Sequence, residues 1–156
     1  MRLQTATRIA IFAVLELASA PDTQRSAAEI AERFGISVNH LAKVLRTLGR
    51  AGLVEALRGV GGGYRFRGNA KRVTLLDVIL LFEMVGPSVD PARESGAATA
   101  PGRALRRVLA ELDDTALATL RSITVATMLK LVAQEEREVA GRPAPAAARA
   151  VGDSTG

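Results

Sequence analysis

The stretch SVNHLAKVLRTLGRAGLVEALRGVGGGYRF, residues 37–66, places a helix signal directly before a glycine-rich turn. Ser37 is a residue type that caps helix N-termini and Gly52 a type that ends helices, so a helix is predicted between them. Two short apolar segments, 53–56 and 64–66, flank the later glycines and predict a β-hairpin. The stretch therefore predicts a helix followed at once by a hairpin.

The preceding residues, PDTQRSAAEIAERFGI (21–36), predict another helix. Ser26 and Glu29 form a capping-box pattern, in which hydroxyl and carboxylate satisfy backbone N–H groups at a helix start. This helix should cover 27–34 and end at Gly35, because glycine adopts the left-handed conformation without a Cβ clash. The short turn between the two helices has the spacing of a helix-turn-helix. With the hairpin added, the unit is a winged helix-turn-helix with a two-stranded β-wing.

Apolar and polar residues segregate along this unit. A shared core is expected from Ile30, Phe34, Ile36, Leu41, Val44 and Leu48. Away from that core lie Asn39, His40, Lys43, Arg46 and Arg50. Taken alone, the charges favour an ordinary solvated helix face, because most charged residues simply face water. The adjacent hairpin shifts the balance towards a nucleic-acid interface.

The glycine-rich turn GVGGGYR (59–65) has a second interpretation, a phosphate-binding loop. It lacks the Walker lysine and the serine or threonine, and a β segment rather than a helix follows it. Nucleotide binding is therefore disfavoured.

Composition limits both the fold and the chemistry. The 156 residues fit one domain, and 48% hydrophobic with only 3% aromatic residues suits packed helices, so the fold class is mainly α. The absence of cysteine excludes disulfides, thiolate nucleophiles and cysteine-held metal clusters. The single histidine, His40, disfavours a metal site or a histidine-based triad. No metal or cofactor is expected.

Charge is distributed unevenly along the chain. Residues 1–72 hold 12 Lys/Arg against 5 Asp/Glu, a net +7, whereas 73–156 hold 9 against 11, a net −2. Such an asymmetry indicates a polyanionic partner, and double-stranded DNA is the leading candidate.

The first twenty residues, MRLQTATRIAIFAVLELASA, combine basic residues, an apolar run and an Ala-Ser-Ala ending, as a secretory signal does. Glu16 interrupts the run, however, and Arg8 lies close to it. The apolar residues recur at helical spacing, at Ile11, Val14, Leu15 and Ala18. An amphipathic helix over 5–19 is therefore preferred. No apolar run approaches the roughly 20 residues needed to cross a membrane, and a cytoplasmic location is expected.

The second half predicts further helices. Thr74 and Asp77 form another capping pattern before a helix over 75–84, which completes a DNA-binding domain over 1–84. A flexible loop rich in proline and glycine is expected over 85–102. A long helix over 103–121 then carries an apolar stripe at Leu105, Val108, Leu109, Leu112, Ala116 and Leu120. Packing within one chain is one possibility for this stripe, but exposed stripes are uncommon in monomers, so homodimerisation is preferred.

The chain end is predicted from composition. Thr124 can cap a short last helix that ends near 136, and the Ala/Pro/Gly-rich segment 137–156 is expected to be a disordered tail.

These motifs resemble the Rrf-two (Rrf2) family of bacterial winged-helix regulators, which includes the IscR, NsrR and CymR types. The resemblance rests on MRL at the start, AEIAERFGIS with NHLAKVL, GLVEALRGVGGGYRF and VTLLDVILLFE, and more weakly on SITVATML. It covers about the first 135 residues. It implies a dimeric DNA-binding transcription factor, usually a repressor, and a dimer is expected to bind a palindromic operator.

The chain departs from this family in one respect. Sensors in the family commonly hold an iron–sulfur cluster through three cysteines in a loop after the wing and its following helix. The corresponding stretch here, GPSVDPARESGAATAPG (86–102), contains no cysteine. Cluster-based sensing is therefore expected to be absent.

The DNA contacts are assigned from the geometry of a helix in the major groove. The candidates at the N-terminal part of the helix are Ser37, Asn39, His40 and Lys43. Asn39 suits adenine and Lys43 suits guanine, whereas His40 is expected equally to pack or to touch phosphate. Arg46 and Arg50, further along, suit phosphate positioning.

The wing and the N-terminus complete the candidate set. The resemblance assigns Arg58 to the minor groove, where narrow A·T-rich segments concentrate negative potential. Gly59 allows close approach of the wing backbone, and Tyr64 lies on the same wing. Arg2 is expected to contact phosphate.

Three classes of function compete. An enzyme is disfavoured, because no carboxylate pair, nucleophile-base set or metal cluster occurs at credible spacing. A winged-helix interaction module that does not bind DNA is the alternative, since fold alone does not establish function. Four basic residues of one sign, Lys43, Arg46, Arg50 and Arg58, favour the DNA-binding regulator instead. A small-molecule effector, a partner protein and constitutive action all stay open.

Overall fold

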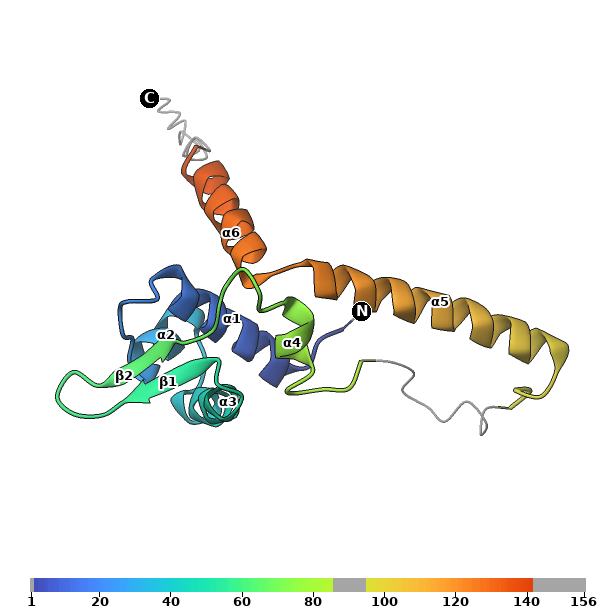
Figure 1. Ribbon diagram of the computed structural model, residues 1–156, viewed down its shortest axis with the longest axis horizontal. Coiled ribbons are helices and arrows are strands. Elements are labelled where there is room, and N and C mark those ends of the chain that lie inside the picture. The colour runs from blue at the N-terminus through green and yellow to red at the C-terminus, as the bar shows by residue number, and fades with distance from the viewer. Residues whose placement is uncertain (1, 86–94, 142–156) are drawn as a thin grey trace, which may run out of the picture.

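The computed structural model describes residues 2–85 and 95–141, and it has the expected mainly α, winged helix-turn-helix architecture (Figure 1). In chain order the elements are α1 (Thr5–Ser19), α2 (Ala27–Phe34), α3 (Val38–Arg50), β1 (Val54–Leu57), β2 (Gly63–Phe66), α4 (Leu75–Ile79), α5 (Ala100–Ser122) and α6 (Val125–Ala140). The two strands pair antiparallel as the wing. None of the helices in the described residues is long and apolar enough to span a membrane.

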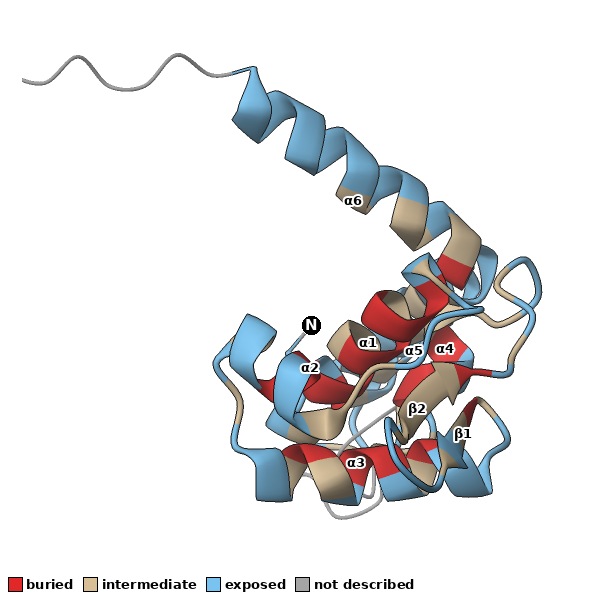
Figure 2. Ribbon diagram, turned by 90° about the vertical axis from the view of Figure 1, so that its left-hand side faces the viewer, coloured by how far each residue is buried: buried red, intermediate tan, exposed pale blue. Residues whose placement is uncertain are grey.

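Helix α1 lies at the centre of the domain, and its buried face is visible in Figure 2. It contacts α2, α3, α4, α6 and β2. Its buried apolar residues are Ile9, Ala10, Ala13, Val14, Leu17 and Ala18. The small alanines let the neighbouring helices approach closely, so the apolar run that resembles a secretory signal forms the centre of the core.

The helix-turn-helix is set by local hydrogen bonds. The Ser26 hydroxyl accepts the Glu29 N–H at 3.1 Å, and the Glu29 carboxylate accepts the Ser26 N–H at 2.7 Å, so the predicted capping box is confirmed. Gly35 ends α2 with a φ of 62°, in the left-handed region that favours glycine. The Ser37 hydroxyl then accepts the His40 N–H at 3.5 Å and starts α3.

The wing pairs with the loop before α2 as well as with itself. The Arg25 N–H donates to the Tyr64 carbonyl at 2.9 Å, and the Tyr64 N–H donates to the Arg25 carbonyl at 2.8 Å. A Cβ atom at Gly63 would lie 2.6 Å from the Arg25 carbonyl oxygen, so this close approach requires glycine. The β2 edge is thereby tied to the chain between α1 and α2.

Helix α4 is shorter than predicted, because it ends at Ile79 and not near Met84. The Leu81 and Phe82 N–H groups donate to carbonyls three residues back and tighten the chain into turns. The predicted Thr74–Asp77 capping box is present at its start.

Helix α5 begins earlier than predicted, at Ala100 and not at residue 103. The Thr99 hydroxyl accepts the Gly102 N–H at 3.2 Å, and Pro101 occupies the first turn, where its missing N–H is not needed. Residues 100–102 of the expected loop are therefore helical, and 86–94 lie outside the described residues.

Helix α6 is longer than the short helix that was predicted, because it continues to Ala140. Gln134 donates to the Glu138 carboxylate one turn on, and Arg137 donates to the Ala133 carbonyl, which extends the helix into the expected tail. Residues 137–140 of that tail are thus helical, and 142–156 lie outside the described residues.

Three backbone hydrogen bonds attach the corner between α5 and α6 to the domain. Leu75 N–H donates to Ile123, Val125 N–H to Val73 and Ala126 N–H to Ala70, each at 2.8 Å. From this fixed corner α5 projects away from the winged domain (Figure 1).

The capping box generates a stability prediction. Ser26→Ala should lower the free energy of unfolding by ~1 kcal/mol at pH 7, measured by urea denaturation, because it removes the acceptor for the Glu29 N–H. Ser122→Ala is the control, since Ser122 bonds only the carbonyl of its own last turn and is exposed. If the two variants lose the same free energy of unfolding, Ser26 does not stabilise the fold as a helix cap.

The same cap has a pH dependence. Hydrogen bonds from the Ser26 backbone and side chain lower the pKa of Glu29 below its ordinary value. A lowered folded-state pKa stabilises the fold above the ordinary glutamate pKa, and this stabilisation is lost as pH falls through the lowered value. Ser26→Ala keeps the backbone N–H that bonds Glu29 and loses only the side-chain contribution, so the difference between wild type and variant should shrink in acid by that contribution alone.

Candidate nucleic-acid interface

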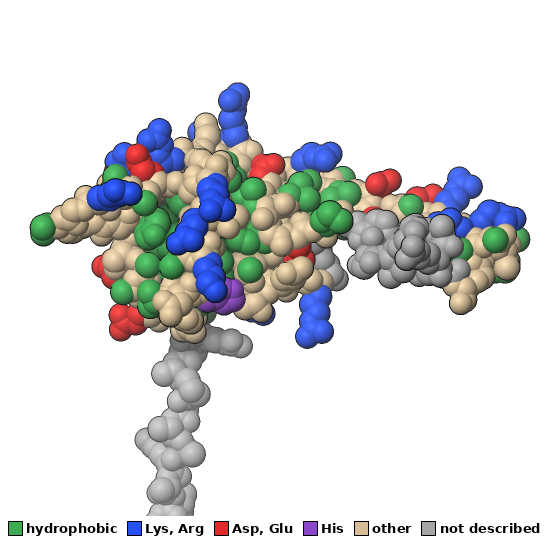
Figure 3. Space-filling view, turned by 90° about the horizontal axis from the view of Figure 1, so that it is seen from below, with side chains coloured by type: hydrophobic (Ala, Val, Ile, Leu, Met, Phe, Trp, Pro, Cys, Tyr) green, Lys and Arg blue, Asp and Glu red, His purple; other side chains and the backbone are tan. Residues whose placement is uncertain are grey.

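Helix α3 presents a basic outer face. Its inward face is buried through Leu41, Val44, Leu45 and Leu48. Lys43, Arg46 and Arg50 are exposed on the opposite side, and the α3 sequence contains no acidic residue. Basic side chains accordingly stand out on the surface seen in Figure 3, which lies over α3. Such a face attracts a polyanion over its whole length.

The start of α3 carries polar groups of unequal exposure. Asn39 is exposed, whereas the Ser37 hydroxyl is engaged as the helix cap. His40 is half-buried and lines a hollow of about 300 Å³ together with Thr5 and Arg8 of α1. Asn39 is therefore the more accessible of these side chains for a base edge.

A groove of about 780 Å³ separates α3 from the wing. Of the predicted residues, Arg46, Arg58 and Tyr64 line it together. Gly59 lies beside Arg58 at the wing turn with a φ of 106°, a conformation that favours glycine. The structure thus brings one α3 candidate, Arg46, into the same groove as the wing candidates Arg58 and Tyr64.

Arg2 is not part of this groove. The N-terminal segment lies beside the end of α4, away from the wing (Figure 1), and the Gln4 N–H donates to the Glu83 carboxylate at 3.2 Å. Arg2 is exposed there. Any contact of Arg2 with the phosphate backbone must occur at a different point from the contacts of the wing.

Sequence reasoning missed the role of Glu55. Glu55 faces Arg65 across the wing, and its carboxylate accepts from Arg65 Nη2 at 2.9 Å and from Arg67 Nη1 at 3.1 Å. The hydrogen bond from Arg65, with the charge of Arg67, holds the pKa of Glu55 below its ordinary value. Glu55 and Arg67 both line the groove. The cross-strand register was the one signal in the sequence that could have paired Glu55 with Arg65.

The predicted apolar stripe forms a second exposed surface. Within the described residues 95–141, α5 buries none of its side chains. Four stripe residues, Leu105, Val108, Leu109 and Leu112, are between 46% and 60% exposed. Ala116 and Leu120, nearer the domain, are half-buried. The outer part of the stripe, from Leu105 to Leu112, is therefore left largely exposed within the described residues.

Comparison with known proteins identifies similar regulators. The family model Rrf2, described as an iron-dependent transcriptional regulator, matches residues 3–131. BadM of Rhodopseudomonas palustris, assigned as an HTH-type transcriptional regulator, is 50% identical over 149 residues, which cover 96% of this chain and 94% of BadM.

Solved structures share the fold. CymR, the global cysteine regulator of B. subtilis, has a TM-score of 0.72 and 24% identity over 84% of this chain and 98% of its own. T. potens IscR has a TM-score of 0.68 and 26% identity over 93% of this chain and 94% of its own. The mainly α winged-helix fold is therefore confirmed.

The iron named in the family description would need ligands from this chain. The sequence contains no cysteine, and its one histidine is His40. Within 2–85 and 95–141, the structure brings no three His, Asp or Glu side chains together as metal ligands. These residues do not fit a cysteine-held iron–sulfur cluster.

The Glu55 pairing generates a prediction for DNA binding. Glu55→Gln should strengthen binding at low salt and steepen the dependence of log affinity on log salt by ~1, because Arg67 becomes available to a phosphate. Fluorescence anisotropy of a labelled duplex at several salt concentrations measures both quantities. Glu111→Gln removes the same charge from α5 and should leave the slope unchanged. A wild-type slope in Glu55→Gln would rule out a contact from Arg67.

Proposed function

Because the chain belongs to the Rrf2 family of transcriptional regulators, which are not enzymes, we propose that it binds double-stranded DNA sequence-specifically as a homodimeric repressor. Its operator is a palindrome, its location is the cytoplasm, and it acts without an iron–sulfur cluster. The observation that carries the proposal is the exposed basic face of α3, which has no acidic residue and whose Arg46 shares a groove with Arg58 of the wing.

The α3 surface has the dimensions and charge for a major groove. An α-helix fits the major groove, and its exposed N-terminal residues then meet base edges. Asn39 reads adenine and Lys43 reads guanine, while Arg46 and Arg50 hold phosphates further along the helix. His40, half-buried against α1, contributes by packing or by a phosphate contact.

The wing supplies flanking contacts. Arg58 is exposed at the start of the wing turn and enters the minor groove, where A·T-rich sequence narrows the groove and raises its negative potential. Gly59 lets the backbone approach the duplex closely. Arg67 and Arg65 are held by Glu55, so the net charge that the wing offers to DNA is lower than its number of arginines suggests.

Homodimerisation follows from the exposed stripe on α5. The helix is 23 residues long, and such a helix extends about 35 Å. Its four exposed apolar residues would be costly to leave in water, and a second copy offers an identical stripe. Pairing two α5 helices also brings two recognition helices into one particle, as a palindromic operator requires.

The chain acts as a regulator without the iron–sulfur cluster that serves as the sensor in other members of the family. The absence of cysteine throughout the sequence supports this. The signal must then act through another site or through no bound group at all.

The competing function is a winged-helix module that binds protein and not DNA. A protein-binding module would not need three basic residues on α3 without an acidic residue on the same helix, so this feature argues against it. The salt dependence of binding to genomic DNA fragments separates the two possibilities, because counterion release gives DNA binding a steep slope.

The contacts should divide by role when each is removed. Asn39→Ala should relax base choice at one position per half-site, with ~1–3 kcal/mol of discrimination lost. Arg50→Ala should weaken all sequences alike and lower the salt slope by ~1, whereas Arg58→Ala should weaken sites with A·T-rich flanks most. Arg107→Ala, on exposed α5, is the control.

Selection of sites from randomised DNA at two salt concentrations measures all of these effects. If every variant keeps the base preference and the salt dependence of the wild type, this face does not bind DNA.

Dimerisation should depend on the centre of the stripe. Replacing Leu109 and Leu112 together by Glu should convert the dimer to a monomer, because charge enters an apolar seam, and operator binding should fall with it. Analytical ultracentrifugation measures the mass. Ala118→Glu places one negative charge on the other side of α5 and should leave the dimer intact. A double variant that sediments as a dimer and binds normally would exclude α5 as the interface.

A further inference from the structure

A cavity of about 600 Å³ lies between α1, α2 and α6, and none of its lining residues belongs to the DNA-facing groove. Phe12 and Phe34 form one wall, with their rings stacked at a centroid distance of 5.2 Å. Leu129 and Val132 of α6 lie on the other side. Both the size and the apolar walls are those of a small-molecule site.

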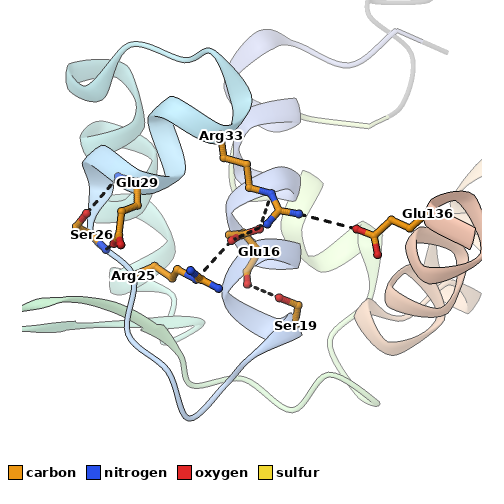
Figure 4. Close-up of polar contacts among 7 residues, drawn as sticks. All are labelled: Glu16, Ser19, Arg25, Ser26, Glu29, Arg33 and Glu136. Atoms are coloured by element: carbon orange, nitrogen blue, oxygen red, sulfur yellow. Dashed lines mark hydrogen bonds and ion pairs between the residues drawn. The ribbon is translucent and has the colours of Figure 1, made fainter. Parts of the chain in front are cut away.

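A buried carboxylate lies at the edge of this cavity. Glu16 of α1 is 7% exposed, and both of its oxygens are used (Figure 4). Arg33 places Nε 3.2 Å from one oxygen and Nη1 3.3 Å from the other, and Arg25 Nε lies 3.5 Å away. Two guanidinium groups therefore share one buried carboxylate.

Around Glu16, the two guanidinium groups offer more hydrogen-bond donors than the nearby carboxylates can accept. The outer edge of Arg33, Nη2, has Glu136 as its nearest acidic partner, at 3.9 Å, which is beyond hydrogen-bond distance. The buried Arg25 Nε makes no hydrogen bond of good geometry within the described residues. Glu136 itself is 66% exposed in its side chain and so is only loosely held. What the site lacks is an acceptor with negative charge.

We propose that this cavity binds a small apolar molecule that carries one anionic group. The anion takes the place of Glu136 on Arg33 Nη2, because a charged acceptor bonds strongly to a guanidinium edge. The apolar body lies between the Phe12–Phe34 wall and α6. Binding of this molecule does not depend on the proposed DNA binding.

The site is also connected to the wing. Glu16 holds the Arg25 side chain, and the Arg25 backbone pairs with Tyr64 of β2 at 2.9 and 2.8 Å. A ligand anion on Arg33 Nη2 shares the Arg33 charge with Glu16, which shifts Glu16 towards Arg25 and so changes the support of the β2 edge. Occupancy should therefore change DNA affinity, an effect that rests on the proposed function.

The matched fluorescent probes anilinonaphthalene sulfonate (ANS) and N-phenylnaphthylamine test the charge requirement, because they share an aromatic body and only the first is anionic. ANS should bind the full chain more tightly than the neutral probe. Arg33→Gln should weaken ANS about tenfold, and Glu136→Gln should strengthen it about threefold, because a competing carboxylate is removed. Glu135→Gln, an exposed neighbour outside the cavity lining, should change neither.

Ala133→Phe should block the site, since Ala133 lines the cavity and is exposed enough to accept a larger side chain without disturbing the core. This variant and Glu136→Gln keep the test valid if Arg33→Gln does not fold.

Several results would overturn the proposal. They are equal affinity for the two probes, equal effects of Glu136→Gln and Glu135→Gln, or undiminished ANS binding in Ala133→Phe. If ANS binds only the Leu109→Glu, Leu112→Glu double variant, then in the wild type a second copy occupies the site, or the probe binds the bare α5 stripe of the variant.

The wing connection has its own readout. ANS should shift the DNA affinity of the wild type and should not shift that of Ala133→Phe. ANS binding with unchanged DNA affinity would overturn the connection to the wing, and a chain that binds ANS but no DNA would overturn the proposed function.

Discussion

The arrangement of the domain depends on one buried carboxylate, Glu16, in the central helix. A buried ion is costly unless it is paired, so the fold must bring cations to it. Arg33 does so from α2 and Arg25 from the loop that pairs with the wing. These pairings hold α2 and the β2 edge against α1. Through the Arg25–Tyr64 backbone pairing, the wing strand β2 is therefore positioned relative to α1.

The proposed DNA-facing surface has exposed basic residues on α3 and paired arginines on the wing. Helix α3 offers Lys43, Arg46 and Arg50 with no acidic residue on the same helix, whereas the wing holds two arginines on Glu55. A uniformly basic surface would bind any duplex, because phosphate contacts carry no sequence information. In the proposed complex, pairing within the wing would limit that general affinity, and the base contacts assigned to α3 would supply a larger share of the discrimination.

The parts of the fold that follow local rules could be predicted from the sequence, and those set by tertiary packing could not. The caps at Ser26 and Thr74 and the turn at Gly35 depend on residues within a few positions, and their predictions were confirmed. The early end of α4 depends on i−3 hydrogen bonds that its apolar pattern does not reveal. The α3 candidate residues could be named from the helix spacing, but the Glu55–Arg65 pairing needed the strand register, and the burial of Glu16 needed the whole packed core.

The corner between α5 and α6 is held by main-chain hydrogen bonds, and main-chain atoms are the same for almost every residue type. The direction in which α5 leaves the domain is thus insulated from changes in the side chains along its stripe. In the proposed homodimer, a lineage of duplicated genes would be able to change the stripe, and with it the choice of partner subunit, without changing the winged domain. If the proposed dimer forms through α5, related regulators in one cell would in this way avoid forming mixed dimers while keeping one surface for DNA.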